Sequence, residues 1–391
     1  MKKICFFMNT PFNLGGEQRI VTVLANYLVN NNYEVYFMLT NSNHEINRKI
    51  YNMDDKIKII FVKEYNKPSF KLKRKILSKL SLFNSKSGLL KNNLSILKKF
   101  YCIESEYNIF KNYFDNYNFD YVIGIGNYYF GKLALLKEKL AFNAKIVAWE
   151  HNCFKAYFET KGLRFFNQYK FVRHILNIFD FYIVQTDDDY KKMSEIFNYK
   201  PLKINNSNTF STYKKSDLKE KNFIAAGRFS NVKNFLFLID CFKKFNEVNN
   251  EWNLYIYGDG EQYKKCLEKV KRYGLDDKIH LPGKTSNMEE KYINSSVYLL
   301  SSLWEGWGMV VTEAMQYGLP VVSTDIPSTR EIFGKTECGK IVSDFSTTAF
   351  SNAMIEIVNN CEYKRISKVC LERVKNFDIE IIGEKWKEIL K

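Results

Sequence analysis

The chain has 391 residues, 46% of them hydrophobic, and this length exceeds what one hydrophobic core usually serves, so two domains are predicted. The formal net charge is +16, yet no helix-turn-helix, zinc-finger or RNP pattern accompanies it, which argues against nucleic-acid binding. The eight cysteines include no Cys-x-x-Cys pair, so their usage indicates a reducing compartment and neither a disulfide framework nor a zinc ribbon.

The first half of the chain alternates short apolar runs with amphipathic segments. Gly15-Gly16 lies between the first run and a segment in which Ile20, Leu24 and Leu28 share one helical face. Alternating strands and helices are typical of a doubly wound parallel sheet. We therefore expect an α/β, Rossmann-like domain over residues 1–203, with strands at 4–8, 35–39, 57–62, 121–125, 145–149 and 181–185.

Residues 67–100 interrupt this pattern with ten Lys or Arg and no Asp or Glu. Apolar residues in this segment recur at spacings of three and four, which predicts amphipathic helices with Leu72, Ile76, Leu80 and Phe83, then Leu90, Leu94 and Leu97, on their apolar faces. Basic amphipathic helices bind anionic membrane surfaces, so we expect this segment to contact a membrane. The alternative is that the apolar residues pack on the domain while the lysines stay in solvent.

Membrane association is expected to be peripheral. Only five apolar residues follow Lys2-Lys3, too few for the core of a signal peptide, and no apolar run approaches the ~18 residues that span a bilayer. The predicted location is therefore the cytoplasm, on the inner face of the cell membrane.

The second half of the chain repeats the alternation after a polar stretch. Residues 200–221 lack periodicity and are predicted to hold the domain junction. A second Rossmann-like domain is then expected over 204–375, followed by a final helix over 376–391, with strands at 223–226, 253–257, 278–281, 297–300 and 321–323.

The loop after the strand at 297–300 carries the most informative motif. It contains Glu305, Gly306 and Gly308 and leads into a helix that carries Glu313. Parallel sheets bind ligands beyond the carboxyl ends of their strands, and the N–H groups of a helix start favour an anion. We predict that the backbone of Gly308, Met309 and Val310 holds phosphate oxygens while the two carboxylates bind hydroxyls. A ligand that combines phosphate groups with several hydroxyls would fit such a site, and a nucleotide sugar is such a ligand.

Four motifs together carry a family resemblance. Glu305-Gly306-x-Gly308 with Glu313-Ala314 resembles the donor-site signature of retaining glycosyltransferases of the GT-B fold, family 4, also called glycosyl transferases group 1. Three further stretches match in order: the glycine loop at 13–19, Ala226-Gly227-Arg228 with Lys233, and the turn at 257–260. The resemblance implies two Rossmann-like domains that face each other across a cleft, with the final helix crossing back to the first domain.

The resemblance also implies an activity and its residues. A sugar passes from a nucleotide donor, with UDP expected, to a hydroxyl, and positive groups stabilise the leaving diphosphate. The residues implied to be catalytic are His151, Arg228, Lys233 and Glu305. The donor would contact Gly16, Gly227, Arg228, Lys233, Gly258, Glu305, Gly306, Gly308, Met309, Val310 and Glu313. The acceptor would contact Gly15, Gly16 and Glu17.

No metal or other cofactor is expected, because Arg228 and Lys233 would take the metal's place at the diphosphate. Asp187-Asp188-Asp189 contains an Asp-x-Asp but is interpreted as the start of a helix. Gly124-Ile-Gly126 lacks the third glycine of a dinucleotide fingerprint, which argues against a nicotinamide enzyme.

The expected acceptor is a glycan or a lipid-linked glycan in capsule, lipopolysaccharide or glycoprotein assembly. Three basic residues, Arg164, Lys170 and Arg173, are further candidates for contact with a lipid pyrophosphate. Two alternatives stay open: a GT-B-fold sugar-nucleotide epimerase, and a non-catalytic nucleotide-sugar-binding subunit. The second is disfavoured because the charged site residues are all present.

Overall fold

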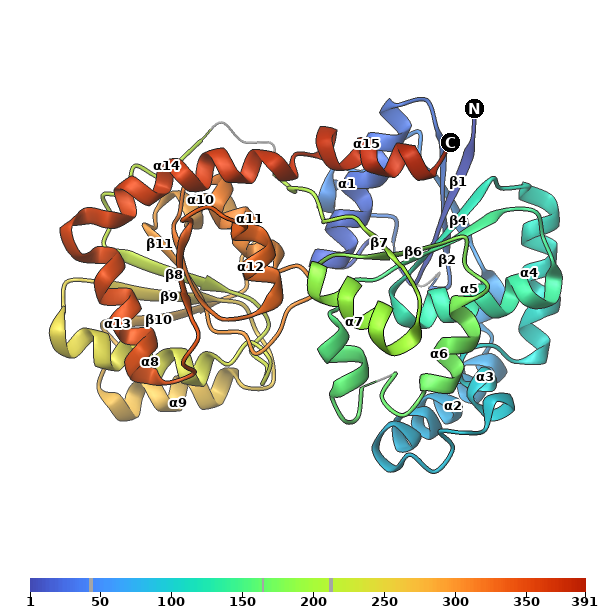
Figure 1. The fold of residues 1–391 in the computed structure, drawn as a ribbon, viewed down its shortest axis with the longest axis horizontal. Coiled ribbons are helices and arrows are strands. Elements are labelled where there is room, and N and C mark those ends of the chain that lie inside the picture. The colour runs from blue at the N-terminus through green and yellow to red at the C-terminus, as the bar shows by residue number, and fades with distance from the viewer. Residues whose placement is uncertain (42–44, 164, 211–213) are drawn as a thin grey trace. The chain divides into compact units, whose positions relative to one another are not determined.

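The computed structural model describes residues 1–41, 45–163, 165–210 and 214–391, so Arg164 lies outside the described residues. The chain divides into two compact units. Unit 1 comprises Met1–Ser207 together with Ile379–Lys391, and unit 2 comprises Asn208–Asp378. In each unit a parallel sheet is covered by helices on both faces (Figure 1).

The sheet of unit 1 has seven strands in the order β3-β2-β1-β4-β5-β6-β7, all paired in parallel. Its central strands are buried on both faces, as a parallel sheet between two helical layers requires, and Cys5 lies in this core. The strands are β1 (Lys3–Met8), β2 (Glu34–Leu39), β3 (Lys58–Phe61), β4 (Tyr121–Ile125), β5 (Lys145–Trp149), β6 (Phe181–Val184) and β7 (Leu202–Lys203).

The helices of unit 1 lie on the crossovers between these parallel strands, except the last helix, which follows unit 2 in the sequence. They are α1 (Gly16–Asn30), α2 (Pro68–Ser87), α3 (Leu94–Tyr101), α4 (Glu104–Tyr117), α5 (Gly126–Leu140), α6 (Tyr169–Leu176), α7 (Asp187–Phe197) and α15 (Ile379–Ile389), with short turns of helix at η1 (Arg48–Tyr51), η2 (Lys63–Asn66) and η3 (Lys155–Glu159). Helix α7 begins with the three aspartates, and its cap is Thr186, which accepts a hydrogen bond from Asp189 N; the predicted helix start is therefore confirmed.

Helix α15 belongs to unit 1 although it follows unit 2 in the sequence. It packs along α1, where Tyr27 Oη donates a 2.7 Å hydrogen bond to Glu384. Trp386 is buried against Trp149 with the ring centroids 4.7 Å apart. A Cβ on Gly383 would overlap the Tyr27 ring, so this close helix packing requires a glycine.

The sheet of unit 2 has six parallel strands in the order β10-β9-β8-β11-β12-β13. The strands are β8 (Asn222–Ala226), β9 (Asn253–Tyr257), β10 (Ile279–Gly283), β11 (Val297–Leu300), β12 (Val321–Thr324) and β13 (Gly339–Val342). The helices are α8 (Phe235–Val248), α9 (Tyr263–Tyr273), α10 (Met288–Ile293), α11 (Met309–Gln316), α12 (Pro327–Phe333), α13 (Thr347–Val358) and α14 (Glu362–Val374), with η4 (Asn359–Cys361) and η5 (Lys375–Phe377).

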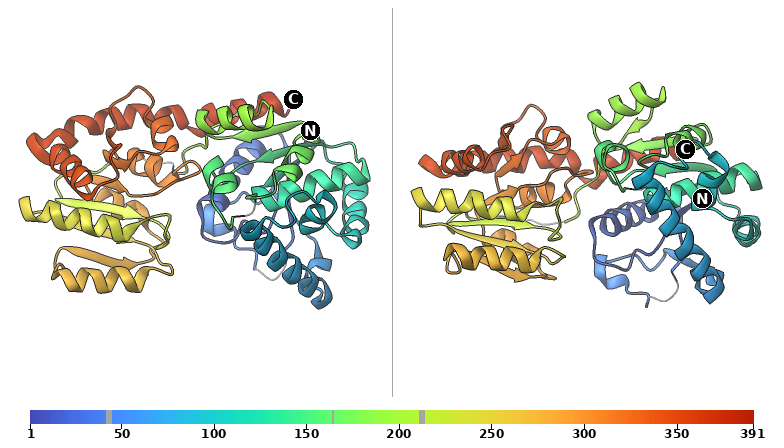
Figure 2. Two further views of the ribbon diagram at one scale, coloured as in Figure 1. Left: turned by 60° about the horizontal axis from the view of Figure 1, so that its bottom comes forward. Right: turned by 90° about the horizontal axis from the view of Figure 1, so that it is seen from below.

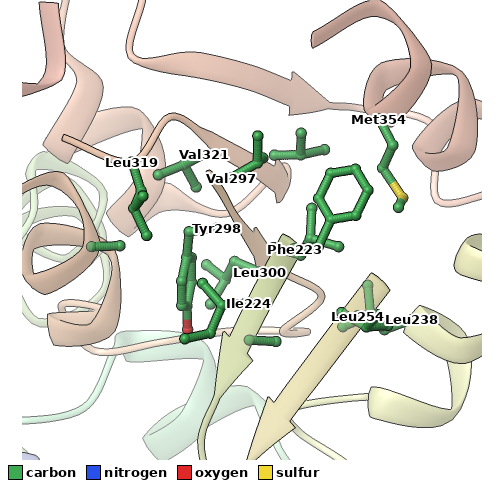
Figure 3. Close-up of a cluster of buried hydrophobic side chains, with 14 of the residues drawn as sticks. Phe223, Ile224, Leu238, Leu254, Val297, Tyr298, Leu300, Leu319, Val321 and Met354 are labelled. Atoms are coloured by element: carbon green, nitrogen blue, oxygen red, sulfur yellow. The ribbon is translucent and has the colours of Figure 1, made fainter. Parts of the chain in front are cut away.

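The core of unit 2 joins its central strands to the covering helices. Phe223 and Leu254 pack beside Leu238 of α8 and Met354 of α13 (Figure 3). On the neighbouring strand the Tyr298 hydroxyl lies 3.3 Å from both the N and the O of Ala226. That contact ties β11 to the end of β8, from which a predicted site loop departs.

The fold class predicted from sequence is confirmed, since both halves of the chain form doubly wound parallel sheets. Two strands were missed, β7 and β13. Both are edge strands that are short and only partly buried, so neither produces the apolar run by which the others were found.

The basic segment is helical as predicted, but its two parts differ in what they bury. Leu97 of α3 is fully buried, whereas the predicted apolar face of α2 points outward: Leu72 is 61% exposed and Phe83 is 55% exposed, and Ile76 and Leu80 are also exposed. The inward face of α2 carries buried Ser81, Asn84 and Ser85. The alternative in which the apolar face packs on the domain is therefore right for α3 and wrong for α2, which lies beside α3 in unit 1 (Figure 2).

Candidate functional site

The predicted donor residues other than Gly16, which lies in unit 1, gather at one point of the sheet of unit 2. Strand β8 is paired with β9 on one side and with β11 on the other, so the strand order reverses between β8 and β11. Loops that leave two such strands diverge and open a ligand site beyond their carboxyl ends. Gly227, Arg228 and Lys233 follow β8, and Glu305, Gly306 and Gly308 follow β11.

Glycines let the loops after β8 and β9 approach closely. Gly227 N donates to Tyr257 O at 2.9 Å, and Gly258 N donates to Gly283 O at 2.9 Å. The φ angles of Gly227 and Gly258 are +155° and +138°. A Cβ on Gly258 would overlap the Gly227 carbonyl, so the turn at Gly258 requires glycine for both its backbone angle and its contact.

An ion pair joins the two loops that flank the reversal point. Lys233 Nζ lies 2.6 Å from Glu305 Oε1, and the two side chains are only 17% and 14% exposed. Ser302 Oγ also donates to Glu305, and Ser301 Oγ donates to Lys233 O at 2.7 Å. The side chains of Lys233 and Glu305 are thus held together by contacts within the protein.

Arg228 contrasts with Lys233. Its side chain is exposed, and within the described part of the chain no hydrogen bond or ion pair engages its guanidinium. The backbone of its loop is fixed, because Phe229 N donates to Asp259 O at 2.6 Å and Ser230 N donates to Arg228 O at 2.8 Å. Arg228 therefore offers a complete set of donors from a rigid loop.

Helix α11 begins directly after the glycines of the second loop. Gly308 caps it with φ +80°, and Val311 N donates to Gly308 O at 2.8 Å. Met309 and Val310 are half-buried in its first turn. Neighbouring Trp307 is 2% exposed and packs edge-on against Phe377 at 5.1 Å, so this indole serves the core.

Glu313 lies in the second turn of α11 and is 5% exposed. Its carboxylate accepts hydrogen bonds from Thr209 Oγ1 at 3.1 Å and from Tyr292 Oη at 3.2 Å. Sequence reasoning did not find these two partners, because they come from positions far apart in the chain and lie in no recognisable motif. They fix the orientation of a carboxylate that would otherwise be free to rotate.

Unit 1 carries the glycine loop at the corresponding edge of its own sheet. Gly16 begins α1, and Gly15 N donates to Tyr51 Oη at 2.7 Å. The same hydroxyl lies 3.2 Å from the carbonyl oxygens of Asn13 and Gly15. Tyr51 therefore clasps the loop, a role that nothing in its sequence surroundings indicates.

Glu17 lies where the strand order of unit 1 reverses, between β1 and β4. A Cβ on Gly126, the first residue of α5, would lie 3.3 Å from Glu17 Oε2, so the starts of α1 and α5 adjoin. Burial raises the pKa of Glu17 to about 7 from its ordinary 4.5. This carboxyl therefore changes charge near neutral pH.

We predict that Glu17→Gln stabilises the protein increasingly as the pH rises. Between about pH 4.5 and 7 the folded state retains a proton that the unfolded state releases, so the wild-type free energy of unfolding falls with pH, and glutamine removes this loss. Urea unfolding at pH 5 and pH 8 measures the difference. Glu195→Gln, at an exposed side chain, is the control, and an equal effect of Glu17→Gln at both pH values contradicts the prediction.

His151 follows β5 in unit 1, and its ring centroid lies 4.6 Å from that of Trp149, with the two rings tilted by 45°. Burial lowers its pKa to about 3, so the imidazole is neutral at pH 7. Its Nε2 is buried and has no hydrogen-bond partner among the residues that the structure describes. A neutral imidazole suits the positioning of a ligand better than the stabilisation of charge.

The predicted site residues thus fall into two sets. The donor set of unit 2 is assembled around the pair of Lys233 and Glu305, while Gly15, Gly16, Glu17 and His151 lie along the carboxyl edge of the sheet of unit 1. In the described ranges no group of three or more His, Cys, Asp or Glu side chains is placed to hold a metal ion.

Known glycosyltransferases are similar to this chain in sequence and in fold. Residues 208–368, which cover most of unit 2, match the family model of glycosyl transferases group 1. An uncharacterized glycosyltransferase of Haemophilus influenzae is 26% identical over 396 residues, which span the whole of both chains. The amylovoran biosynthesis glycosyltransferase AmsD of Erwinia amylovora is 29% identical over 173 residues, or 44% of this chain and 48% of that protein.

Among solved structures, Anabaena HepE in complex with UDP and glucose superposes with a TM-score of 0.71 at 14% identity, covering 100% of this chain and 99% of that one. At this identity the likeness concerns the fold. Together with the parallel sheets, these likenesses identify the chain as a glycosyltransferase of the GT-B fold, in which residues 208–368 match the glycosyl transferases group 1.

Proposed function

We propose that this glycosyltransferase moves a sugar from a UDP-sugar, with retention of anomeric configuration, to a hydroxyl of a glycan or lipid-linked acceptor used in building cell-surface polysaccharide or other glycoconjugates. The observation that carries the proposal is the joined pair of loops at the reversal point of unit 2, with Lys233 held by Glu305 and Arg228 on the same loop as Lys233. The solved complex of HepE with UDP and glucose supports the choice of nucleotide, and AmsD supports the choice of pathway class.

The chemical demand is negative charge that grows on the diphosphate as its bond to the sugar breaks. Arg228 supplies a planar fork from a loop whose backbone is fixed, and Lys233 supplies a compact charge that Glu305 holds in place. Positive groups preorganised at the diphosphate lower the barrier. Glu305 keeps Lys233 in place and presents its second oxygen to sugar hydroxyls. The backbone N–H groups of Gly308, Met309 and Val310 hold phosphate oxygens. Gly227 and Gly258, which lack side chains, let the diphosphate come close to the loop backbone.

Glu313 completes the proposed donor site by accepting hydrogen bonds from the ribose hydroxyls. In this proposal Gly306 lets the loop backbone come close to the donor. In unit 1 we assign Gly15, Gly16 and Glu17 to the acceptor, and His151 to positioning the transferred sugar. Gly16 also faces the donor in this proposal. Each of these assignments extends the geometry of the two sheet edges to a bound substrate.

A panel of UDP- and GDP-sugars tests the proposal directly. Each is measured for thermal stabilisation of the full chain and for slow hydrolysis, with and without EDTA. One UDP-sugar that both stabilises the protein and is hydrolysed is the expected result. No response to any sugar nucleotide, or activity abolished by EDTA, would remove the support for a metal-independent transferase.

We also propose that α2 attaches the enzyme to an anionic membrane surface. The four outward apolar side chains of α2, at 72, 76, 80 and 83, are flanked by exposed lysines at 71, 73, 75, 79 and 86. An apolar stripe between lysines complements a bilayer whose headgroups are negative and whose interior is apolar. No helix among the described residues is long and apolar enough to cross the bilayer.

Replacing Leu72, Ile76, Leu80 and Phe83 together by serine is expected to weaken vesicle binding at least tenfold, because the stripe no longer enters the acyl boundary. Sedimentation with vesicles containing phosphatidylglycerol measures the effect. Replacing Lys73, Lys75, Lys79 and Lys86 together by glutamate should release the protein from these vesicles at low salt.

The matched control makes the same change of charge at the exposed Lys264, Lys265, Lys271 and Arg272 of α9. Equal release by both sets of glutamates would show that only net charge matters, and would contradict a role for α2.

A further inference from the structure

A buried charged cluster lies in unit 1 beneath α2, outside the residues assigned above. Arg74 of α2 and Lys132 of α5 both form ion pairs with Glu106 of α4. The side chains of Lys132 and Glu106 are fully buried, and that of Arg74 is 15% exposed. Two cations therefore share one carboxylate, which leaves the cluster with an uncompensated positive charge.

Tyrosines surround these cations without neutralising them. Lys132 Nζ lies 4.8 Å from the ring centroid of Tyr65 and 4.9 Å from that of Tyr128, and it donates a hydrogen bond to Tyr65 Oη. Arg74 lies 5.8 Å from the Tyr128 ring. Burial lowers the pKa of Lys132 to about 8, so it still carries its proton at pH 7. The surplus charge therefore persists at neutral pH.

A cavity of about 340 Å³ opens onto this cluster. Arg74, Tyr65 and Tyr128 line it, and Lys71 adds a second basic side chain one turn earlier in α2. Asn9 and Thr40, which also line it, follow β1 and β2. The cavity thus lies at the carboxyl edge of the sheet, where parallel sheets bind ligands, and no carboxylate lines it.

The cluster is unsatisfied in hydrogen bonds as well as in charge. Arg74 Nε is buried and has no hydrogen-bond partner in the part of unit 1 that the structure describes. Buried donors without acceptors and buried charges without counter-charges are both costly. An anion in the cavity would relieve both costs, because it would bring acceptor oxygens and negative charge to the same guanidinium.

We propose that this cavity binds a phosphate group, with Arg74 and Lys71 as its basic contacts. One phosphate oxygen would accept a hydrogen bond from Arg74 Nε, which has no partner among the described residues, and another would accept from Lys71. A volume of about 340 Å³ also leaves room for the molecule that carries the phosphate. That the carrier is the acceptor rests on the proposed function; the phosphate site itself does not.

Isothermal titration with inorganic phosphate tests the site. The full chain with Arg228→Ala and Lys233→Ala is the parent, so that the proposed donor site adds no phosphate binding. We expect Lys71→Gln and Arg74→Leu each to weaken phosphate binding at least fivefold. Lys73→Gln, at an exposed lysine of α2 that does not line the cavity, should leave the affinity within twofold of the parent.

Both variants are expected to fold. Lys71 is exposed, and removal of Arg74 leaves Glu106 paired with Lys132 in a balanced buried pair. Absence of phosphate binding in the parent overturns the proposal, and so does an equal loss for Lys73→Gln. The assay needs no sugar transfer, so its failure is distinct from failure of the proposed function.

A second arm distinguishes the source of the phosphate. Vesicles containing phosphatidic acid are bound to the parent and titrated with inorganic phosphate. Displacement that is lost in Lys71→Gln identifies a lipid-borne phosphate as the ligand. Phosphate binding with no displacement identifies a phosphate carried by a soluble molecule or a glycan, and either result supports the site.

Discussion

Arg228→Ala is expected to lower kcat at least tenfold. In other enzymes, loss of one preorganised donor to a developing anion lowers kcat by about a hundredfold or more. The loss should appear in kcat, because the charge on the diphosphate grows only as the bond to the sugar breaks. Since Arg228 is exposed, the free energy of unfolding should change by less than about 0.5 kcal/mol. Steady-state kinetics and urea unfolding measure the two quantities.

Lys233→Ala should lower kcat to a similar extent but with a different effect on stability. Its removal leaves Glu305, 14% exposed, without its counter-charge, so we expect some loss of stability that Lys233→Ala with Glu305→Gln recovers. Activity should stay low in the double variant. Arg272→Ala, at an exposed arginine of α9, is the control, and full activity in both Arg228→Ala and Lys233→Ala would remove the diphosphate assignment.

Gly258→Ala is expected to abolish nucleotide binding and to cost about 2–4 kcal/mol of stability. The φ of +138° disfavours any side chain there, and the added Cβ would overlap the Gly227 carbonyl, so the loop that carries Arg228 must move. Thermal unfolding with and without UDP measures the stability and the binding together.

Two other glycines separate the causes of that effect. Gly274→Ala has a positive φ of +63° with nothing within 4 Å of the added Cβ, so a smaller loss of stability and normal binding are expected. Gly339→Ala would overlap the Val321 carbonyl within the sheet, away from the loops after β8 and β9. It should destabilise unit 2, yet the protein that remains folded should bind nucleotide.

The sequence predicted the fold well because parallel strands buried on both faces leave continuous apolar runs. The edge strand β13, at Gly339–Val342, leaves no such run and was missed. The donor loops were predictable for a similar reason. Gly227, Gly258 and Gly308 adopt positive φ angles, which favour glycine, so these loops leave glycine motifs in the sequence.

Partners brought together only by the fold could not be predicted. Tyr51 clasps the glycine loop and Tyr292 holds Glu313, but each acts on residues distant in sequence and leaves no pattern near itself. Helix α2 is instructive because its apolar periodicity was correct while the side it faces was not determined by periodicity. Only the packing of Ser81 and Ser85 against the domain reveals that the apolar stripe points outward.

The position of α15 has a consequence for biosynthesis. Unit 2 is one continuous stretch, whereas unit 1 needs α15, which covers Tyr27 and Trp149 and is translated only after the whole of unit 2. During translation, unit 2 is therefore synthesised completely before unit 1 receives its last helix. During that interval the surface of unit 1 that α15 will cover, which includes Tyr27 and Trp149, is exposed. We expect a chaperone to act on this surface.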